Sequence, residues 1–303
     1  MDRKDFLKTL ALFAAGLASP IPRFNIRAAN QKPASTSELA VGEGKNYIEL
    51  TREIIRSLGG MSRFVKTGDT VVVKPNIGWD RKPDQGANTH PLVVKAVIQE
   101  VLDAGAGRVK VFDYTCNEAR RCYVNSGIQD AVKSLKLKKV EIFHIDRRKF
   151  IPVEIENGRS IDKWEFYKDA LEADAYINVP VAKHHGLSGL TLGLKNVMGV
   201  IGNPRGRIHH HIGQKLADLA TVIRPKLTVI DATRMLTRNG PQGGNLKDVH
   251  VANTVLASTD PVAADAYATS LFGLSPDSIA STVKAYEMNL GEIHLNKVKI
   301  KHI

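Results

Sequence analysis

The sequence is poor in cysteine and in long apolar runs. Its 303 residues include two cysteines, Cys116 and Cys122. Two thiols cannot hold an iron–sulfur cluster, because such a cluster takes four protein ligands. The apolar run near the amino terminus, from Thr9 to Ala18, has about ten residues and is too short to span a bilayer.

Nucleotide and nucleic-acid signatures are also absent. The chain has neither the GxxxxGK[ST] phosphate-binding motif nor a GxGxxG motif after a strand. Its formal charge is +12, but no nucleic-acid recognition motif accompanies it, and the basic residues are spread along the chain. We therefore expect no nucleic acid partner and interpret the charge as a bias toward small anionic molecules.

What the sequence does contain is enough apolar material for a large core. With 43% hydrophobic residues, the chain can fold as one large domain. The two cysteines lie close together in DYTCNEARRCY, and in an exported protein they could form a disulfide. Two unreactive thiols or metal ligation are the alternatives that the sequence leaves open.

The amino terminus has the pattern of an export signal. A basic stretch, DRKDFLK, precedes the apolar run and resembles the twin-arginine signal, with Lys4 where the second arginine belongs. We predict an export signal over residues 1–30, a linker over 31–44 and a single α/β domain over 45–303. The expected location is the periplasm, with membrane attachment only if the signal stays uncleaved. Because the twin-arginine route carries folded proteins, the resemblance favours a bound cofactor.

Short β-branched runs alternate with helical patterns along the rest of the chain. This alternation predicts an α/β fold, a mostly parallel sheet with helices on both faces. Two helix starts have proline in the first turn, at Pro91 and at Pro261, where Asp260 is placed to cap. The expected strands are residues 70–76, 108–114, 140–146, 175–185, 227–232 and 253–261.

Polar residues stand at or just after the ends of these expected strands. In an open α/β sheet, ligands bind outside the carboxyl ends of the strands. The topology therefore predicts that much of the chain's chemistry gathers at one edge, although an aspartate after a strand is more often a helix cap or turn former. The residues are Lys74, Asn76, Asp113, Asp146, Lys183, His184, His185, Asp231 and Asp260.

The stretch from Lys183 to His211 holds five of the ten histidines. Imidazoles serve both proton transfer and metal ligation. Adjacent strand residues point to opposite faces, so His184 and His185 cannot both face one site. Lys195 is flanked by apolar residues, and a partly desolvated lysine can act as a base, nucleophile or anion ligand. The glycines and the nearby arginines Arg205, Arg207, Arg234 and Arg238 favour a phosphate or carboxylate as ligand.

Several segments of the chain resemble the bacterial and archaeal family called domain of unknown function 362. They include VVVKPNIG, AYINVPVAKHHGLSGLTLGLKNVMGVIG and LASTDPVAADAYATSLFG. The resemblance runs from about residue 70 to 273 and brings no reaction with it. Many members of that family carry ferredoxin-like cluster modules, which this chain lacks, so the resemblance also suggests a redox partner protein.

A fainter pattern is similar to the amino-terminal domain of the nickel-dependent lactate racemase family. The matching pieces are NTHP with His90, HGLSG with His185, then Lys195 and the triple histidine that ends at His211. The resemblance implies that His90 and His185 move protons, that Lys195 contacts a cofactor and that His211 ligates a metal. The sequence departs from that family where LGLK replaces a glycine-rich approach to the lysine.

These observations favour an exported enzyme that performs acid/base chemistry, isomerisation or racemisation, on a small carboxylate with a divalent metal or metallocofactor. An iron–sulfur-linked redox accessory and a non-catalytic anion-binding protein are the alternatives. The expected site has three parts: catalytic His90, His185 and Lys195; cofactor-binding Lys74, Asn76, Asp113, Lys183, Asn196 and Arg207; and the metal ligands His209 and His211.

Overall fold

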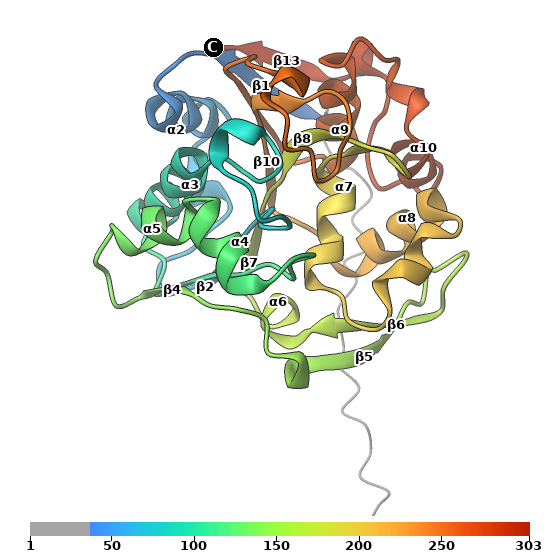
Figure 1. Cartoon of the computed structure of the whole chain (residues 1–303), viewed down its shortest axis with the longest axis horizontal. Coiled ribbons are helices and arrows are strands. Elements are labelled where there is room, and N and C mark those ends of the chain that lie inside the picture. The colour runs from blue at the N-terminus through green and yellow to red at the C-terminus, as the bar shows by residue number, and fades with distance from the viewer. Residues whose placement is uncertain (1–36) are drawn as a thin grey trace, which may run out of the picture. The chain divides into compact units, whose positions relative to one another are not determined.

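The computed structural model describes residues 37–303, which form an α/β structure around one large sheet (Figure 1). Its strands follow the order β13-β1-β12-β10-β7-β2-β3-β4, with β8 and β11 paired to β10 and β9 paired to β8. Most of the pairings are parallel, as the sequence predicts. The strands are β1 (Glu38–Glu43), β2 (Thr70–Pro75), β3 (Arg108–Val111), β4 (Val140–Ile142), β7 (Ala175–Val179), β8 (Val181–His185), β9 (Gly189–Thr191), β10 (Leu227–Leu236), β11 (Val249–His250), β12 (Thr254–Ser258) and β13 (Lys299–His302).

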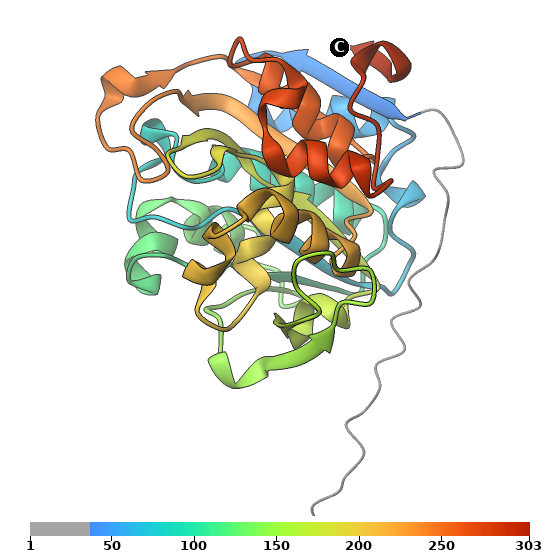
Figure 2. The same ribbon diagram turned by 90° about the vertical axis from the view of Figure 1, so that its right-hand side faces the viewer.

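Helices cover both faces of this sheet, which confirms the predicted fold class. In Figure 1, α2, α3 and α5 lie on one side and α7, α8 and α10 on the other. A hairpin of β5 (Phe150–Glu154) and β6 (Lys163–Tyr167) lies below α7 and α8 in Figure 2. The helices are α2 (Tyr47–Ser57), α3 (Pro91–Asp103), α4 (Ala119–Asn125), α5 (Ile128–Lys133), α6 (Lys168–Leu171), α7 (Gly193–Asn196), α8 (Ile212–Val222), α9 (Pro261–Ser270) and α10 (Ala280–Glu287).

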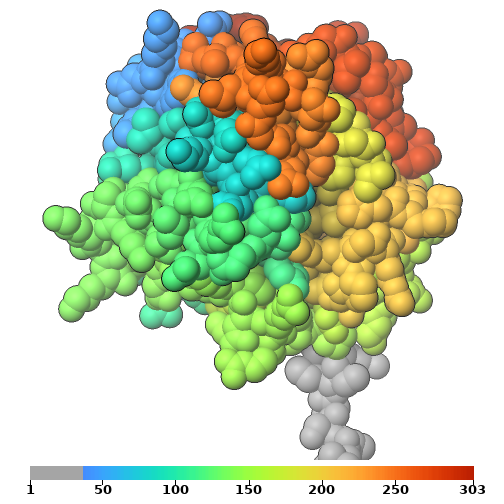
Figure 3. Space-filling model, in the orientation of Figure 1, coloured from blue at the N-terminus to red at the C-terminus, as the bar shows by residue number. Residues whose placement is uncertain are grey.

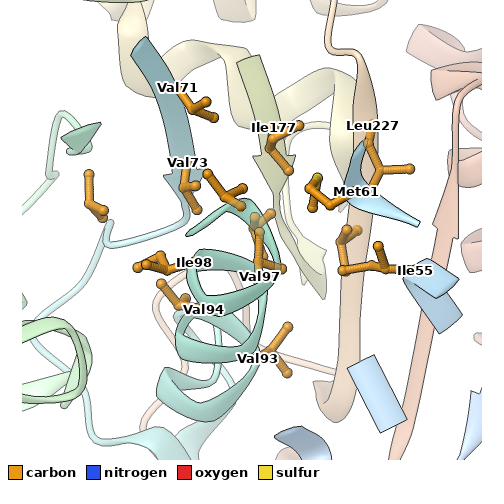
Figure 4. Packing of buried hydrophobic residues seen from close by; sticks show 14 of the residues in the cluster. Ile55, Met61, Val71, Val73, Val93, Val94, Val97, Ile98, Ile177 and Leu227 are labelled. Atoms are coloured by element: carbon orange, nitrogen blue, oxygen red, sulfur yellow. The ribbon is translucent and has the colours of Figure 1, made fainter. Parts of the chain in front are cut away.

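The two faces of β2 enter different cores because successive strand residues point to opposite sides. Val71 and Val73 pack against α3, where Figure 4 shows Val94 and Val97 beside them. Val72 faces the other core, with β6 and α8. Lys74 continues the Val72 face, so its side chain points to the side of the sheet that carries α7.

The predicted helix starts are confirmed by their caps. The Asp260 carboxylate accepts hydrogen bonds from the backbone N–H groups of Val262 and Ala263 at 2.9 Å, and Pro261 is the first residue of α9. Pro91 likewise begins α3. Gly105 follows that helix with φ 91°, a conformation that glycine adopts without strain.

Three sequence expectations need correction. Residues 38–43 of the predicted linker form β1, which lies between β12 and β13 in the sheet. The expected strand 175–185 is broken at Pro180, which lacks the N–H that a ladder needs. The strand β12 runs antiparallel to β10, so Asp260 lies at the opposite edge from the ends of β2 and β3.

The structure holds Cys116 and Cys122 as free thiols, one exposed and one buried, rather than as a disulfide. Within residues 37–303, no helix is both long and apolar enough to cross a membrane. The predicted export signal lies outside the described residues.

Candidate functional site: a lysine-lined cavity

A cavity of about 480 Å³ opens at the carboxyl edge of the parallel strands. Its floor comes from the end of β2, one wall from the segment after β3, and another from β8, α7 and the loop before α8. In the space-filling view of Figure 3, cyan-green residues from the first half of the chain meet the orange and yellow segments of the second half near the middle. The predicted residues that line the cavity are Lys74, Asn76, Asp113, Lys183, His185, Lys195, Asn196 and His209.

Three predicted site residues do not line this cavity: His90, Arg207 and His211. Arg207 is exposed. His211 is the residue before α8, with φ 59°, and its ring lies edge-on to His210 at 4.2 Å. The arginine that reaches the cavity is instead Arg205.

The side chain and the backbone of His90 make structural contacts. Its Nδ1 accepts a hydrogen bond from the Leu92 N–H at 3.2 Å and so caps α3. Its own backbone N–H donates to Asp231 Oδ2 at 2.6 Å, and its ring lies edge-on to Tyr47 at 4.8 Å. The expected pairing of His90 with His185 across one cavity is therefore wrong, because the His90 imidazole caps α3 and does not line the cavity.

The floor of the cavity is a buried network built on Lys74. Its Nζ lies 2.8 Å from Asp113 Oδ1 and donates to Asn196 Oδ1 at 2.8 Å. Asn76 donates to the same amide oxygen at 3.2 Å. Burial lowers the pKa of Lys74, and the Asp113 charge partly offsets that effect. Asp113 and Asn196 already hold this ammonium, so we interpret Lys74 as structural.

Gly199 roofs this ion pair at very short range. A Cβ at this position would lie 1.7 Å from Asp113 Oδ1 and 2.4 Å from Lys74 Nζ. The glycine therefore serves close packing over the lysine and aspartate. The sequence suggested that glycine N–H groups in this loop bind an anionic ligand. The N–H of Gly193 instead donates to Asp265 Oδ1 at 2.7 Å.

Lys183 is a second buried amine, with 1% of its surface exposed. Its Nζ donates to the Ala87 carbonyl and, at 3.3 Å, to Asn76 Oδ1. Both acceptors are neutral. Burial lowers the pKa of Lys183 to about 7, with Lys195 and Lys74 adding to the effect and Cys116 opposing it. This amine is thus placed to change its charge near neutral pH.

Lys195 is carried by α7, which is fixed from behind. Asp265 of α9 accepts from the N–H groups of Gly193 and Leu194 at 2.7 and 3.0 Å. Burial raises the pKa of Asp265 to about 7 against these two hydrogen bonds. The Lys195 Nζ lies 2.9 Å from Met198 Sδ, and burial first, then Arg205 and Lys74, lower its pKa to about 8.

The two neighbouring histidines separate as strand geometry predicts. His185 lines the cavity, whereas the Nδ1 of His184 accepts from the Gly240 N–H at 3.1 Å. The Nδ1 of His185 accepts from the N–H groups of Leu187 and Ser188 at 3.1 and 3.3 Å. Because Nδ1 is an acceptor, the proton of the neutral ring is on Nε2.

The charge state of His185 follows from its surroundings. Burial first, then the charges of Lys195, His209 and Lys183, lower its pKa to about 3. The ring is therefore neutral at physiological pH, and its Nε2–H can donate a hydrogen bond. His209 stacks on it with ring centroids 5.9 Å apart.

Arg205 and Cys116 also line the cavity, outside the predicted catalytic, cofactor-binding and metal residues, although the sequence marked Arg205 among the arginines that favour an anion. Arg205 donates to the carbonyls of Tyr114 and Thr115 at 2.7 and 2.8 Å, and its guanidinium lies 3.9 Å above the Tyr114 ring. Cys116 lines the same cavity. Its position just after β3 was the available signal, because the strand-end rule that selected Asp113 applies to it as well.

The cavity therefore has an excess of positive charge. Within the described part of the chain, Asp113 is paired with Lys74, and no carboxylate lies within ion-pair distance of Lys183, Lys195 or Arg205. Cations withdrawn from water without a counter-ion are unfavourable. The arrangement favours an anion as the molecule that enters.

The side chains do not fit a divalent metal. Among residues 37–303, no group of three or more histidine, cysteine, aspartate or glutamate side chains could hold an ion. His209 faces the cavity while His211 does not, so the two predicted ligands diverge.

A family model and a curated protein match this chain in sequence. A model of the family described as "Domain of unknown function (DUF362)" matches residues 71–270. The "Thylakoid-associated protein sll1697" of Synechocystis sp. is 28% identical over 256 residues, which cover 82% of this chain and 77% of that protein.

Two solved structures are similar at lower levels. The lactate racemase apoprotein of Thermoanaerobacterium thermosaccharolyticum is 13% identical, with a TM-score of 0.41, over 63% of this chain and 50% of that one. A protein from Thermotoga maritima is 12% identical, with a TM-score of 0.44, over 81% of this chain and 60% of that one. This chain thus spans half to three fifths of those two proteins.

Proposed function

Since this chain belongs to the DUF362 family, whose description assigns no reaction, we propose a function from the cavity itself: an isomerase-like enzyme that moves a proton in a small carboxylate. The observation that carries the proposal is the group of three cations, Lys183, Lys195 and Arg205, that face one cavity without a carboxylate partner among the described residues. A carboxylate or phosphate would supply the missing negative charge.

The contacts give Lys195 and His185 different roles. Lys195, with a pKa lowered to about 8, has an appreciable neutral fraction near pH 7.5 and can take a proton. His185 is neutral with its proton on Nε2, so it suits donation to a substrate oxygen that gains negative charge. The lysine therefore replaces the histidine pair that the sequence suggested as the proton-moving group.

Binding is tested with malonate, a small dicarboxylate, at constant ionic strength. We expect malonate to raise the melting temperature of the protein by a few degrees, because a ligand at about 100 times its Kd adds about 2.7 kcal/mol. Lys195→Gln should lose most of this shift. Lys247→Gln, which removes an exposed lysine outside the cavity, should keep it. Equal shifts in both variants would refute binding in this cavity.

Proton transfer is tested by loss of C–H signals in D2O. Pyruvate, lactate and alanine are incubated with the protein and followed by NMR. We expect exchange beside the carbonyl or carboxylate of at least one of them, reduced about 10²-fold or more in Lys195→Gln. Malonate binding without exchange of any probe would instead favour a non-catalytic anion-binding protein.

We also propose that the chain is exported to the periplasm. The support is the basic and apolar pattern of residues 1–30 alone. Fractionation of the native host, with the mature amino terminus read by mass spectrometry, tests this. An intact amino terminus on protein found in the cytosol contradicts it.

A further inference from the structure

Three lysines reach the same cavity, but their amines are not equally held. Lys74 Nζ has Asp113 and Asn196 as partners. Lys183 Nζ has two oxygen acceptors, the Ala87 carbonyl and Asn76. Oxygen acceptors stabilise the ammonium form and orient its N–H groups. These two amines are therefore fixed as donors.

Lys195 differs in both its partner and its access. Its polar contact is Met198 Sδ at 2.9 Å, and a thioether is a weak acceptor. Its side chain is also partly exposed, unlike those of Lys74 and Lys183, which are 0% and 1% exposed. Once the amine loses its proton, no strong donor among the described residues holds its lone pair, and the side chain lines the cavity.

The backbone around this amine is rigid. Asp265 holds the start of α7 through two N–H groups. Asn196, the next residue, donates to the Lys74 carbonyl at 3.2 Å and to Asn178 Oδ1 at 2.8 Å. A reactive group on a fixed backbone keeps its direction toward a bound molecule, which is the condition for efficient attack.

The neighbouring charges favour nucleophilic chemistry. Arg205 and Lys74 lower the pKa of Lys195 in addition to burial, as adjacent cations do for lysines that form Schiff bases. Near pH 7.5, a lysine with a pKa of about 8 has on the order of a hundredfold more neutral amine than one at about 10.4. Arg205, together with the ammonium form of Lys183, can hold the carboxylate of a ligand.

We propose that Lys195 is a nucleophile that forms an imine with the carbonyl group of a small 2-oxo acid. This inference rests on the proposed function, names its substrate class and gives Lys195 a covalent role in place of that of a general base. The neutral Nζ attacks the carbonyl carbon, and a C–N bond forms as the C=O π bond opens to a hydroxyl. Both amine protons leave with that oxygen as water, which gives C=N with no change of oxidation state.

The surroundings assist this step and its consequence. The Nε2–H of neutral His185 can donate to the oxygen that gains charge during attack. Protonation of the imine then draws electrons from the adjacent C–H bond and makes it acidic. The acidified C–H bond lies on the carbon next to the imine carbon, which is where a 2-oxo acid can exchange or move a proton.

The experiment traps the imine with cyanoborohydride in the presence of pyruvate near neutral pH. Peptide mass mapping of the full chain should find the reduced pyruvyl adduct on Lys195, at least about tenfold above any other lysine. Its neutral fraction exceeds that of ordinary surface lysines, and its amine, unlike that of buried Lys183, is accessible from the cavity. Malonate should suppress the adduct. Heat-denatured protein should show no preference for this residue.

Two variants separate this inference from the proposed function. Lys195→Arg keeps the charge but not the nucleophile, so it should retain stabilisation by malonate and lose the adduct. Met198→Leu removes the sulfur contact without touching charge, and it should keep the adduct. Stabilisation of the wild type by pyruvate with no adduct on Lys195 overturns the imine and leaves the carboxylate site standing. An adduct spread evenly over the lysines also overturns it, and absence of both stabilisation and adduct overturns both proposals.

Discussion

Two polar clusters at the same edge of the sheet differ in how their polar groups are paired. Around His90, the polar groups satisfy one another: Asp231 accepts from the His90 N–H, Arg234 donates to the Tyr47 hydroxyl, and that hydroxyl donates to Asn253. Around Lys195, cations face a cavity with neutral partners. Polar groups that are paired with one another contribute to stability, whereas cations with neutral partners can still bind an anion. The hydrogen-bond partners of the two clusters, and not their residue types, distinguish one from the other.

The largest expected effect comes from breaking the buried ion pair of Lys74 and Asp113 in the floor of the cavity. Asp113→Ala leaves the buried Lys74 ammonium without its counter-ion and should cost about 3–5 kcal/mol of unfolding free energy. Chemical denaturation measures it. Asp146→Ala is the control, since its pair with Arg148 is exposed, and it should cost far less. Equal losses in the two variants would mean that burial of the ion pair has no special weight.

Lys183, which has neutral acceptors as its hydrogen-bond partners, should make the stability of the protein depend on pH. The pKa of Lys183 is about 7 in the folded chain and near 10.5 when unfolded, so the unfolded chain binds the extra proton between these values. Stability should therefore rise with pH across this window, by at most about 1.4 kcal/mol per pH unit from this group. Denaturation of Lys183→Met over the same pH range should show a smaller rise. A slope identical to that of the wild type contradicts a depressed pKa.

The smallest expected effect concerns His90. His90→Ala removes the side-chain cap of α3 and should lower stability by about 1 kcal/mol, while the shift produced by malonate stays unchanged. His90→Asn, which supplies another cap acceptor, should restore most of the loss. A variant that folds normally but no longer responds to malonate would place His90 in the binding site after all.

The sequence allowed the fold class and most of the cavity to be predicted. Strand ends marked Lys74, Asp113 and His185, because parallel strands deliver their last residues to one edge. The rule failed for Asp260, since a single sequence does not say that β12 runs antiparallel. His90 was selected by the lactate racemase resemblance instead. A histidine before a helix can cap that helix, and the pattern alone does not distinguish a cap from a base.

The support behind α7 gives a physical meaning to the extent of the family match. The matched segment begins at residue 71, in the strand that carries Lys74, and ends at residue 270, the last residue of α9, which carries Asp265. Strands β1 and β13 lie outside it. The matched segment therefore contains both the floor of the cavity and the carboxylate that holds the start of α7 in place.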